Sequence, residues 1–278
     1  MIKLDHGRKM FCNPRFMKRV FIPYLIILVA GCSLIAQTDV SPSVAYRDAI
    51  RAAAVVTPEK VQPLTPVSGG DAVLVVSWVS PAGAKASCSI PPGQSSCQFT
   101  RSSDSVPRET PVWVVLHDEL RSKCGAWQLH DFALQQRMEQ LLGLPLNQPE
   151  PFRKTEFLIM RVSPSALYRP CVGEDDSDPS HPSCLVRMDA AVHPQPEWLS
   201  AFVSQYSVWA YVLPESGAPG YPFTRLGYTY DWHLPPSEKG NYGVSEFIIS
   251  LNTPITVIGT ETTDAFCDLG QKRITNAF

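Results

Sequence analysis

The sequence lacks the motifs that identify the best-known hydrolase and zinc sites. It contains no Gly-x-Ser-x-Gly and no His-Glu-x-x-His element, so the templates of α/β-hydrolases and zinc proteases gain no support. It contains no Cys-x-x-Cys pair, and His181 near Cys184 does not complete a set of four zinc ligands. The acidic run at 174–178 lacks the spacing and the glycine of an EF-hand calcium loop. We therefore predict no metal site and no cofactor.

Positive charge is scarce once the N-terminal segment is set aside. Residues 1–32 carry six of the 24 Lys and Arg residues and one of the 26 Asp and Glu residues, so the chain from Cys32 onward has a net charge of −7. Nucleic-acid binding requires a basic surface that neutralises phosphates, and electrostatic attraction to anionic lipid requires one too. We therefore predict that the protein has no nucleic-acid partner.

The apolar run at residues 20–30 is too short to cross a membrane, because a transmembrane helix needs about 20 residues. A basic pair at 18–19 precedes the run, and Val29-Ala30-Gly31-Cys32 ends it. This arrangement is typical of a bacterial lipobox, in which the signal peptide is cleaved before the cysteine and acyl chains such as palmitate anchor the new N-terminus. The alternative is an ordinary cleaved signal peptide with a coincidental Gly-Cys pair.

The lipoprotein interpretation places the protein in the cell envelope. We expect residues 1–31 to form the signal peptide, with translation starting at Met17, and Cys32 to carry the lipid. Ser33 stands where an aspartate commonly retains lipoproteins at the inner membrane, so we expect the periplasmic side of the outer membrane. The expected partners are membrane lipid, held through the acyl anchor, and a protein of the envelope.

Six cysteines remain when Cys12 and Cys32 are set aside, and an even number in an exported chain predicts a disulfide framework. A turn-rich segment separates the first two of them, and an acidic loop separates the fourth from the fifth. The local spacing therefore favours three pairs: Cys88 with Cys97, Cys171 with Cys184, and, by elimination, Cys124 with Cys267.

Hydrophobic patterning predicts both strands and helices after a linker. Residues 32–70 read as a lipidated tether with one short helix at 44–56, and residues 71–278 as a single domain. Continuous apolar runs predict buried strands, and apolar residues at helical spacing predict helices. The expected strands are 72–79, 112–116, 157–162, 244–250 and 255–260, and the expected helices of the domain are 131–142 and 197–213.

Two further features of the pattern bear on the architecture. Asn252-Thr253-Pro254 predicts a hairpin between the last two strands. The aromatic stripe of the second helix, formed by Trp198, Phe202, Tyr206 and Trp209, is more typical of core than of a ligand platform. Strands and helices do not alternate in the βαβ rhythm of parallel sheets, so we predict an α+β fold with a largely antiparallel sheet flanked by a few helices.

Residues 225–232, Arg-Leu-Gly-Tyr-Thr-Tyr-Asp-Trp, are followed by Ser245-Glu246-Phe247. With Leu142-Gly143-Leu144-Pro145 and Arg169-Pro170-Cys171, this pattern resembles a family of uncharacterised exported bacterial proteins, over about residues 112–267. The resemblance implies an exported protein and assigns no activity.

Polar groups are concentrated in this pattern, which makes it the candidate site. Two interpretations stay open. In one, the pattern is a structural corner in which Arg225 pairs with Asp231 or Glu246. In the other, it borders a pocket beside the sheet in which Glu246 acts as acid, base or ligand clamp. The candidate residues are Arg225, Tyr228, Tyr230, Asp231 and Glu246.

The position of Glu246 at the start of a strand that is followed by a second strand also resembles the end of an ADP-ribosyltransferase domain. That resemblance implies that Glu246 orients a nicotinamide ribose. It also implies that His117 takes the place of a histidine or arginine, and Tyr228 or Tyr230 that of an aromatic residue or serine, which come earlier in that family's sequences. No intact motif of that family is present. We therefore favour a membrane-anchored binding or interaction protein, and the alternative is an extracytoplasmic enzyme with an ADP-ribosyltransferase-like site.

Overall fold

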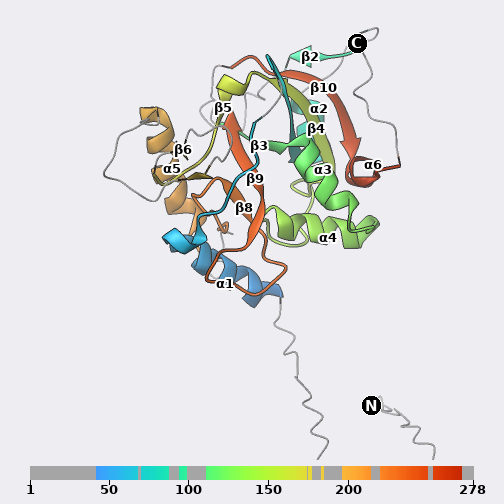
Figure 1. The fold of residues 1–278 in the computed structure, drawn as a ribbon. Helices are drawn as coiled ribbons and strands as arrows, with labels where there is room; N and C mark the ends of the chain where they lie inside the picture. The colour runs from blue at the N-terminus through green and yellow to red at the C-terminus, as the bar shows by residue number, and fades with distance from the viewer. Residues whose placement is uncertain are drawn as a thin grey trace, which may run out of the picture. The chain divides into compact units, whose positions relative to one another are not determined.

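An antiparallel sheet forms the centre of the structure (Figure 1), a computed structural model that describes residues 42–67, 70–87, 94–98, 111–173, 175–176, 183–184, 196–213, 220–249 and 253–270. Its strands follow the order β2-β10-β4-β1-β3-β9-β5, and β8 also pairs with β9. The strands are β1 (Val73–Val79), β2 (Cys97–Gln98), β3 (Val112–Leu116), β4 (Glu156–Val162), β5 (Leu167–Tyr168), β8 (Tyr228–Tyr230), β9 (Tyr242–Ile249) and β10 (Thr256–Thr262). A separate short ladder joins β6 (Asp175–Asp176) to β7 (Ser183–Cys184).

Helices flank this sheet, so the predicted α+β class is confirmed. In the view of Figure 1, α3 and α4 lie to the right of strands β3, β8 and β9 and α5 lies to their left. Helix α5 packs on Trp113 and Ile248, which are on the same face of the sheet as Val115. The helices are α1 (Pro42–Ala54), α2 (Pro81–Ser87), α3 (His117–Gly125), α4 (Asp131–Leu141), α5 (Glu197–Ala210) and α6 (Thr263–Cys267), with short 3-10 turns at Pro58–Lys60 and Pro164–Ala166.

Each buried strand carries apolar side chains on both faces, as the continuous apolar runs predict. One face packs with α2 in a cluster that includes Val75, Val114 and Met160. The other face, called here the helical face, packs against α3, α4 and α6 through Val76, Val115 and Ile159 among others. Two separate cores, one on each face, therefore hold the sheet in place.

The predicted hairpin between the last two strands is wrong. Strand β9 pairs with β3 on one edge and with β5 and β8 on the other, so neither edge is open to β10. Strand β10 pairs with β4 and β2 instead, and three strands separate it from β9 in the sheet. A turn signal between two strands in the sequence therefore does not determine which strands become neighbours in the sheet.

Strands β1 and β3 are neighbours over a short length only. Val75 pairs with Leu116 and Val76 with Val115, whereas β1 pairs with β4 along all of Val73–Val79. Strand β3 likewise pairs with β9 from Val112 to Val115. Beyond Val76 the two strands each follow a different neighbour, so the sheet opens between its two halves.

Two of the three predicted disulfides are present. Cys124 bonds Cys267, which joins α3 to α6, and Cys171 bonds Cys184. Cys97 is also disulfide-bonded, but the expected partner Cys88 lies outside the described residues. The lipobox with Cys32 lies outside them as well.

The segment expected as a tether contributes to the domain core. Helix α1 buries Tyr46, Ala49 and Ile50 against Tyr230 and Trp232. The Tyr46 hydroxyl donates to the Gly220 carbonyl at 2.8 Å. The backbone N–H of Thr65 donates to Ser245 Oγ at 2.7 Å. The packed unit thus begins near residue 40 instead of residue 71, and within the described ranges no helix is both long and apolar enough to cross a membrane.

Candidate functional site: a cavity at Glu246

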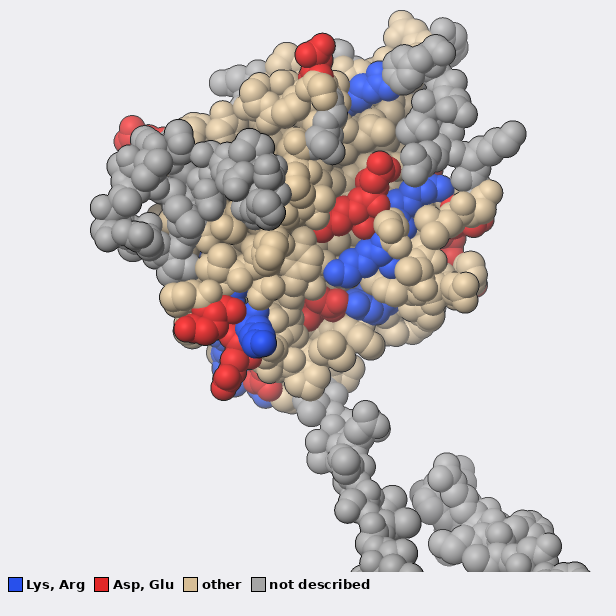
Figure 2. All heavy atoms as spheres, in the orientation of Figure 1, with Lys and Arg blue, Asp and Glu red and all other residues tan. Residues whose placement is uncertain are grey.

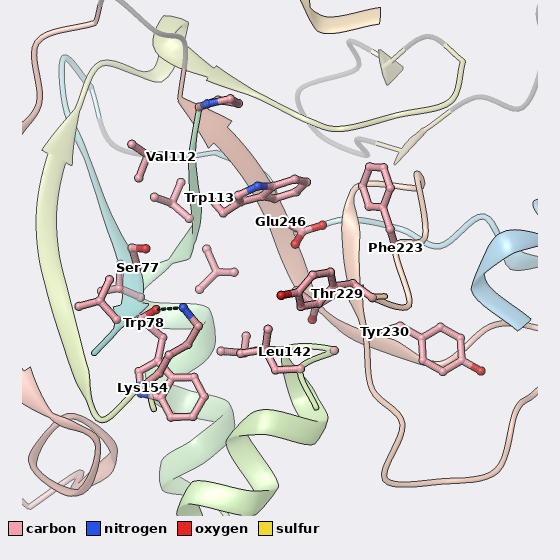
Figure 3. Close-up of a pocket in the computed structure, with 18 of the residues that line it drawn as sticks. Ser77, Trp78, Val112, Trp113, Leu142, Lys154, Phe223, Thr229, Tyr230 and Glu246 are labelled. Atoms are coloured by element: carbon pink, nitrogen blue, oxygen red, sulfur yellow. Dashed lines mark hydrogen bonds between the residues drawn. The ribbon is translucent and has the colours of Figure 1, made fainter. Parts of the chain in front are cut away.

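A cavity of about 530 Å³ lies where β1 and β3 diverge. Its floor is the helical face of the sheet, and its walls come from the end of α4, from α5 and from residues 221–223. Figure 3 shows β1 and β3 on its two sides, with Glu246 projecting from β9 among the other lining residues. The aromatic lining consists of Trp78, Trp113, Phe157, Tyr206, Tyr221, Phe223 and Tyr230. A volume in this range is typical of small-molecule sites.

Glu246 is the one carboxylic acid among the described residues of the lining. It stands directly opposite Val115 in the β3–β9 ladder, which turns its side chain toward the helical face. Burial raises the pKa of this carboxyl to about 8, and no partner offsets the shift among the residues that the structure describes. A partly protonated acid therefore faces the cavity at neutral pH.

The raised pKa has a consequence for stability. Between about pH 4.5 and pH 8 the unfolded chain ionises Glu246 while the folded protein keeps it protonated. The folded state then binds more protons than the unfolded state, so this group lowers the free energy of unfolding as the pH rises through that window. Glu246 thus opposes folding at high pH, as functional carboxyls in apolar sites commonly do.

Three aromatic rings form one wall beside this carboxyl. The Trp113 ring centroid lies 5.1 Å from that of Tyr206 and 5.6 Å from that of Phe223, and those of Tyr206 and Phe223 are 5.1 Å apart. Helix α5 therefore contributes Tyr206 to the cavity, and Phe202 packs behind it on Trp113. Trp209 of the same stripe is 65% exposed, so the prediction that the whole stripe is core is wrong for Trp209.

The cation of the lining is Lys154. Its Nζ donates to the carbonyl of Trp78 at 3.2 Å, on the edge of β1 where the ladder to β3 has ended. Burial lowers the pKa of Lys154. The Lys154 side chain thus supplies a hydrogen bond to a β1 carbonyl that β3 does not reach. It forms no ion pair with another described residue.

The segment 225–232 is a packing junction that holds the neighbouring elements together. Arg225, with φ of 56°, lies in a left-handed turn and donates to the Ala54 carbonyl at 2.7 Å, with its guanidinium 5.2 Å from the Tyr211 ring centroid. It pairs with neither Asp231 nor Glu246 among the described contacts. Trp232 donates to the Leu144 carbonyl at 3.0 Å. The segment thereby connects α1, α5 and the loop after α4.

The two candidate tyrosines point away from the centre of the cavity. The Tyr228 hydroxyl donates to the Lys60 carbonyl at 2.9 Å, and its ring packs in a separate cluster with Leu64 and Leu226. The Tyr230 ring packs with Tyr46, and its buried hydroxyl lacks a hydrogen-bond partner within the described ranges. Tyr230 borders the cavity, but Figure 3 shows its hydroxyl turned away from Glu246.

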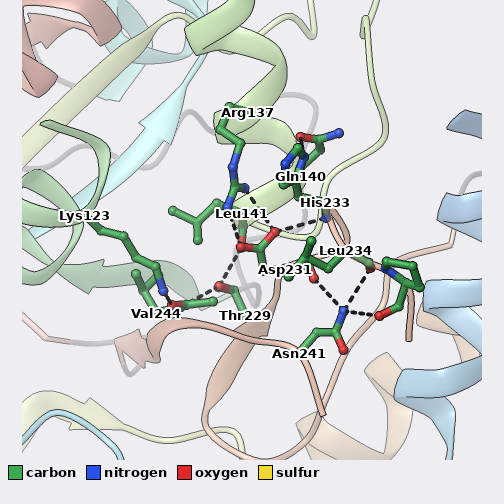
Figure 4. Close-up of polar contacts among 12 residues, drawn as sticks. Lys123, Arg137, Gln140, Leu141, Thr229, Asp231, His233, Leu234, Asn241 and Val244 are labelled. Atoms are coloured by element: carbon green, nitrogen blue, oxygen red, sulfur yellow. Dashed lines mark hydrogen bonds and ion pairs between the residues drawn. The ribbon is translucent and has the colours of Figure 1, made fainter. Parts of the chain in front are cut away.

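Asp231 forms a two-point ion pair with Arg137 of α4, which sequence reasoning did not anticipate. The distances are 3.0 Å from Nη1 to Oδ1 and 2.6 Å from Nη2 to Oδ2 (Figure 4). Thr229, one residue from Tyr230, donates to the Leu141 carbonyl at 2.8 Å. A Cβ at Gly243 would collide with Thr229, so β9 passes this point only as glycine. These contacts fix β8 to the end of α4.

Charges of both signs lie together on the face shown in Figure 2. A band of acidic and basic side chains crosses α3 and α4, a second group lies near α1, and the area between them is largely uncharged.

His117, the remaining candidate, begins α3 and is 3% exposed, with its ring edge against Phe266. It does not line the cavity, so the structure does not bring it together with Glu246.

The cavity is thus made mostly of residues that the sequence did not single out as functional. Of the six candidates, only Glu246 and Tyr230 border it. A carboxylate within an apolar strand was the usable signal for Glu246. Nothing in the sequence marks Tyr221 or Lys154, since their place depends on how β1 and β3 diverge.

Within the described residues, no group of three or more His, Cys, Asp or Glu is arranged to hold a metal ion. Comparisons with protein-family models, with curated proteins and with solved structures find no match to this chain.

Proposed function

We propose that the protein is a lipoprotein of the bacterial envelope that binds a small ligand in the Glu246 cavity. The observation that carries the binding role is the unpartnered Glu246 carboxyl in an aromatic cavity of about 530 Å³. Burying a carboxyl without a partner destabilises the folded protein. Such a group is typical of a binding site, where the ligand supplies the missing partner. The lipobox supports the envelope location, where the acyl anchor at Cys32 holds the domain at the periplasmic side of the outer membrane.

The binding role is tested with the apolar fluorescent probe N-phenyl-1-naphthylamine. We expect saturable binding to the wild-type protein, with one probe per chain, because the lining offers mainly aromatic and aliphatic groups. Leu142→Trp fills the cavity and should abolish this binding. Leu234→Trp is the matched control, since Leu234 is 66% exposed and lies outside the lining. Equal binding by both variants would contradict the proposal, and circular dichroism checks that each is folded.

The envelope location is tested by cell fractionation. Cys32→Ser removes the thiol that carries the acyl chains, so the protein should move from the membrane fraction to the soluble fraction. Ser33→Ala changes the neighbouring residue, keeps the Cys32 thiol and should leave fractionation unchanged. Retention of Cys32→Ser in the membrane fraction would rule out lipid anchoring at this residue.

A further inference from the structure

Glu246 has no positively charged partner among the residues that the structure describes. Arg225, the cation expected beside it, donates to the Ala54 carbonyl instead. Lys154 lines the same cavity but donates to the Trp78 carbonyl. Among the described residues, then, the cavity presents a carboxyl whose charge is not neutralised. A ligand that carries its own positive charge is the natural complement of such a group.

The wall beside Glu246 is suited to a cation. Trp113, Tyr206 and Phe223 contact one another with ring centroids 5.1–5.6 Å apart, and all three line the cavity. Aromatic faces attract ammonium groups, most strongly where water is excluded. The same wall covers the apolar part of a ligand, so it serves a molecule with one charged end and one apolar end.

Two phenols complete the polar surroundings. Tyr206 and Tyr221 line the cavity. Burial, and then the proximity of Tyr221 and Glu246, raise the pKa of Tyr206. Tyr206 and Tyr221 thus line the same cavity as Glu246, and the charges of Tyr206 and Glu246 interact. A primary ammonium group has three N–H donors, which the Glu246 carboxylate and the two phenol oxygens can accept.

Lys154 does not compete with this role. Its Nζ donates to the Trp78 carbonyl on the strand edge, and burial lowers the pKa of Lys154. The titratable groups that face the cavity are Glu246, Lys154, Tyr206, Tyr221 and Tyr230, and burial raises the pKa of all three tyrosines. The pKa of about 8 places the ionisation of Glu246 near neutral pH.

We propose that the Glu246 cavity binds small amphipathic organic amines, with the ammonium group at Glu246 and the apolar part between β1 and β3. This inference rests on the proposed function and names the class of its ligand. Because Glu246 is largely protonated in the free protein at pH 7 and ionised beside the ammonium, binding releases up to about one proton.

The test compares three probes of one skeleton: 4-phenylbutylamine, 4-phenyl-1-butanol and 4-phenylbutyrate. Their affinities are measured at pH 7 by displacement of N-phenyl-1-naphthylamine. Calorimetry in two buffers of different ionisation enthalpy gives the number of protons released. We expect the amine to bind about tenfold more tightly than the alcohol, since a charge-assisted contact is stronger than a neutral one. The carboxylate should bind most weakly.

Glu246→Gln should remove both the preference for the amine and the proton release while keeping the affinity for the alcohol. The matched control is Glu238→Gln, which changes an exposed carboxyl outside the lining and should behave as wild type. Binding of the alcohol as tightly as the amine, or the same amine preference in Glu246→Gln, would overturn the amine assignment and leave the binding function intact. Failure of all three probes to displace bound naphthylamine would likewise overturn only the amine assignment, whereas no naphthylamine binding at all would overturn both proposals.

Discussion

Replacing both cysteines of the Cys124–Cys267 disulfide by alanine will lower the free energy of unfolding by about 5 kcal/mol. This disulfide spans 143 residues, and the loop-closure entropy that a crosslink removes from the unfolded chain grows with loop length. It also joins α3 to α6 within the core of the helical face. Domains of this kind have total stabilities of about 5–15 kcal/mol, so the C124A/C267A variant should be close to unfolding at 25 °C. Guanidinium unfolding followed by tryptophan fluorescence measures the loss.

The second disulfide provides the matched comparison. Cys171 and Cys184 are 13 residues apart, and the same entropy argument gives about 3 kcal/mol for the C171A/C184A variant. The expected order is therefore wild type, then C171A/C184A, then C124A/C267A. If the shorter loop proves the costlier to open, loop closure is not the source of the stabilisation.

Apolar patterning predicted the strands and helices that are buried. Strand β1, strand β4 and helix α4 lie within one residue of their predicted bounds. Their continuous or helically spaced apolar residues are buried in the two cores. Helix α3 was missed because it begins with His117, Asp118 and Glu119, so its sequence resembles a surface loop. Its fixed position comes from tertiary packing, which buries His117 and Arg121 despite their polarity.

The sequence did not predict which distant strands pair with one another. The turn at 252–254 gave the wrong neighbour for β10, because edge availability and not turn chemistry decides the partner. The cavity has the same origin, since it exists only where β1 and β3 separate after two paired positions. A single sequence carries no sign of that separation. Of the cavity lining, the sequence pointed only to Glu246, as a carboxyl in a mostly apolar strand, and to Tyr230, as part of residues 225–232.

Most side chains of residues 225–232 stabilise the fold and do not line the cavity. Side chains of this segment reach the Ala54 carbonyl, the Leu141 and Leu144 carbonyls and Arg137. Each contact closes a long stretch of chain with a directional polar bond, and such bonds tolerate few residue types. A specific local pattern therefore arises without any ligand, and the candidate ligand site lies beside it.

Replacing Asp231 by alanine will lower the free energy of unfolding by about 3 kcal/mol. Asp231 and Arg137 are each 14% exposed at the side chain and meet through two short hydrogen bonds. The guanidinium also lies 4.4 Å from the Trp127 ring centroid, which holds it in place. Removing one partner of a buried pair leaves the other charge uncompensated, which costs about 3–5 kcal/mol, and the residual exposure favours the lower value. Urea unfolding of D231A measures the change.

The double variant R137M/D231A distinguishes the effect of an uncompensated buried charge from the effect of lost packing contacts. With both charges removed, no uncompensated charge stays buried, so the double variant should be more stable than D231A although it has lost more contacts. Arg51→Ala is the exposed control, because the Arg51–Asp48 pair has side chains 57% and 43% exposed and should contribute less than about 0.5 kcal/mol. A double variant less stable than D231A would mean that Arg137 stabilises the junction mainly through packing, for example on the Trp127 ring, and not through its charge interaction with Asp231.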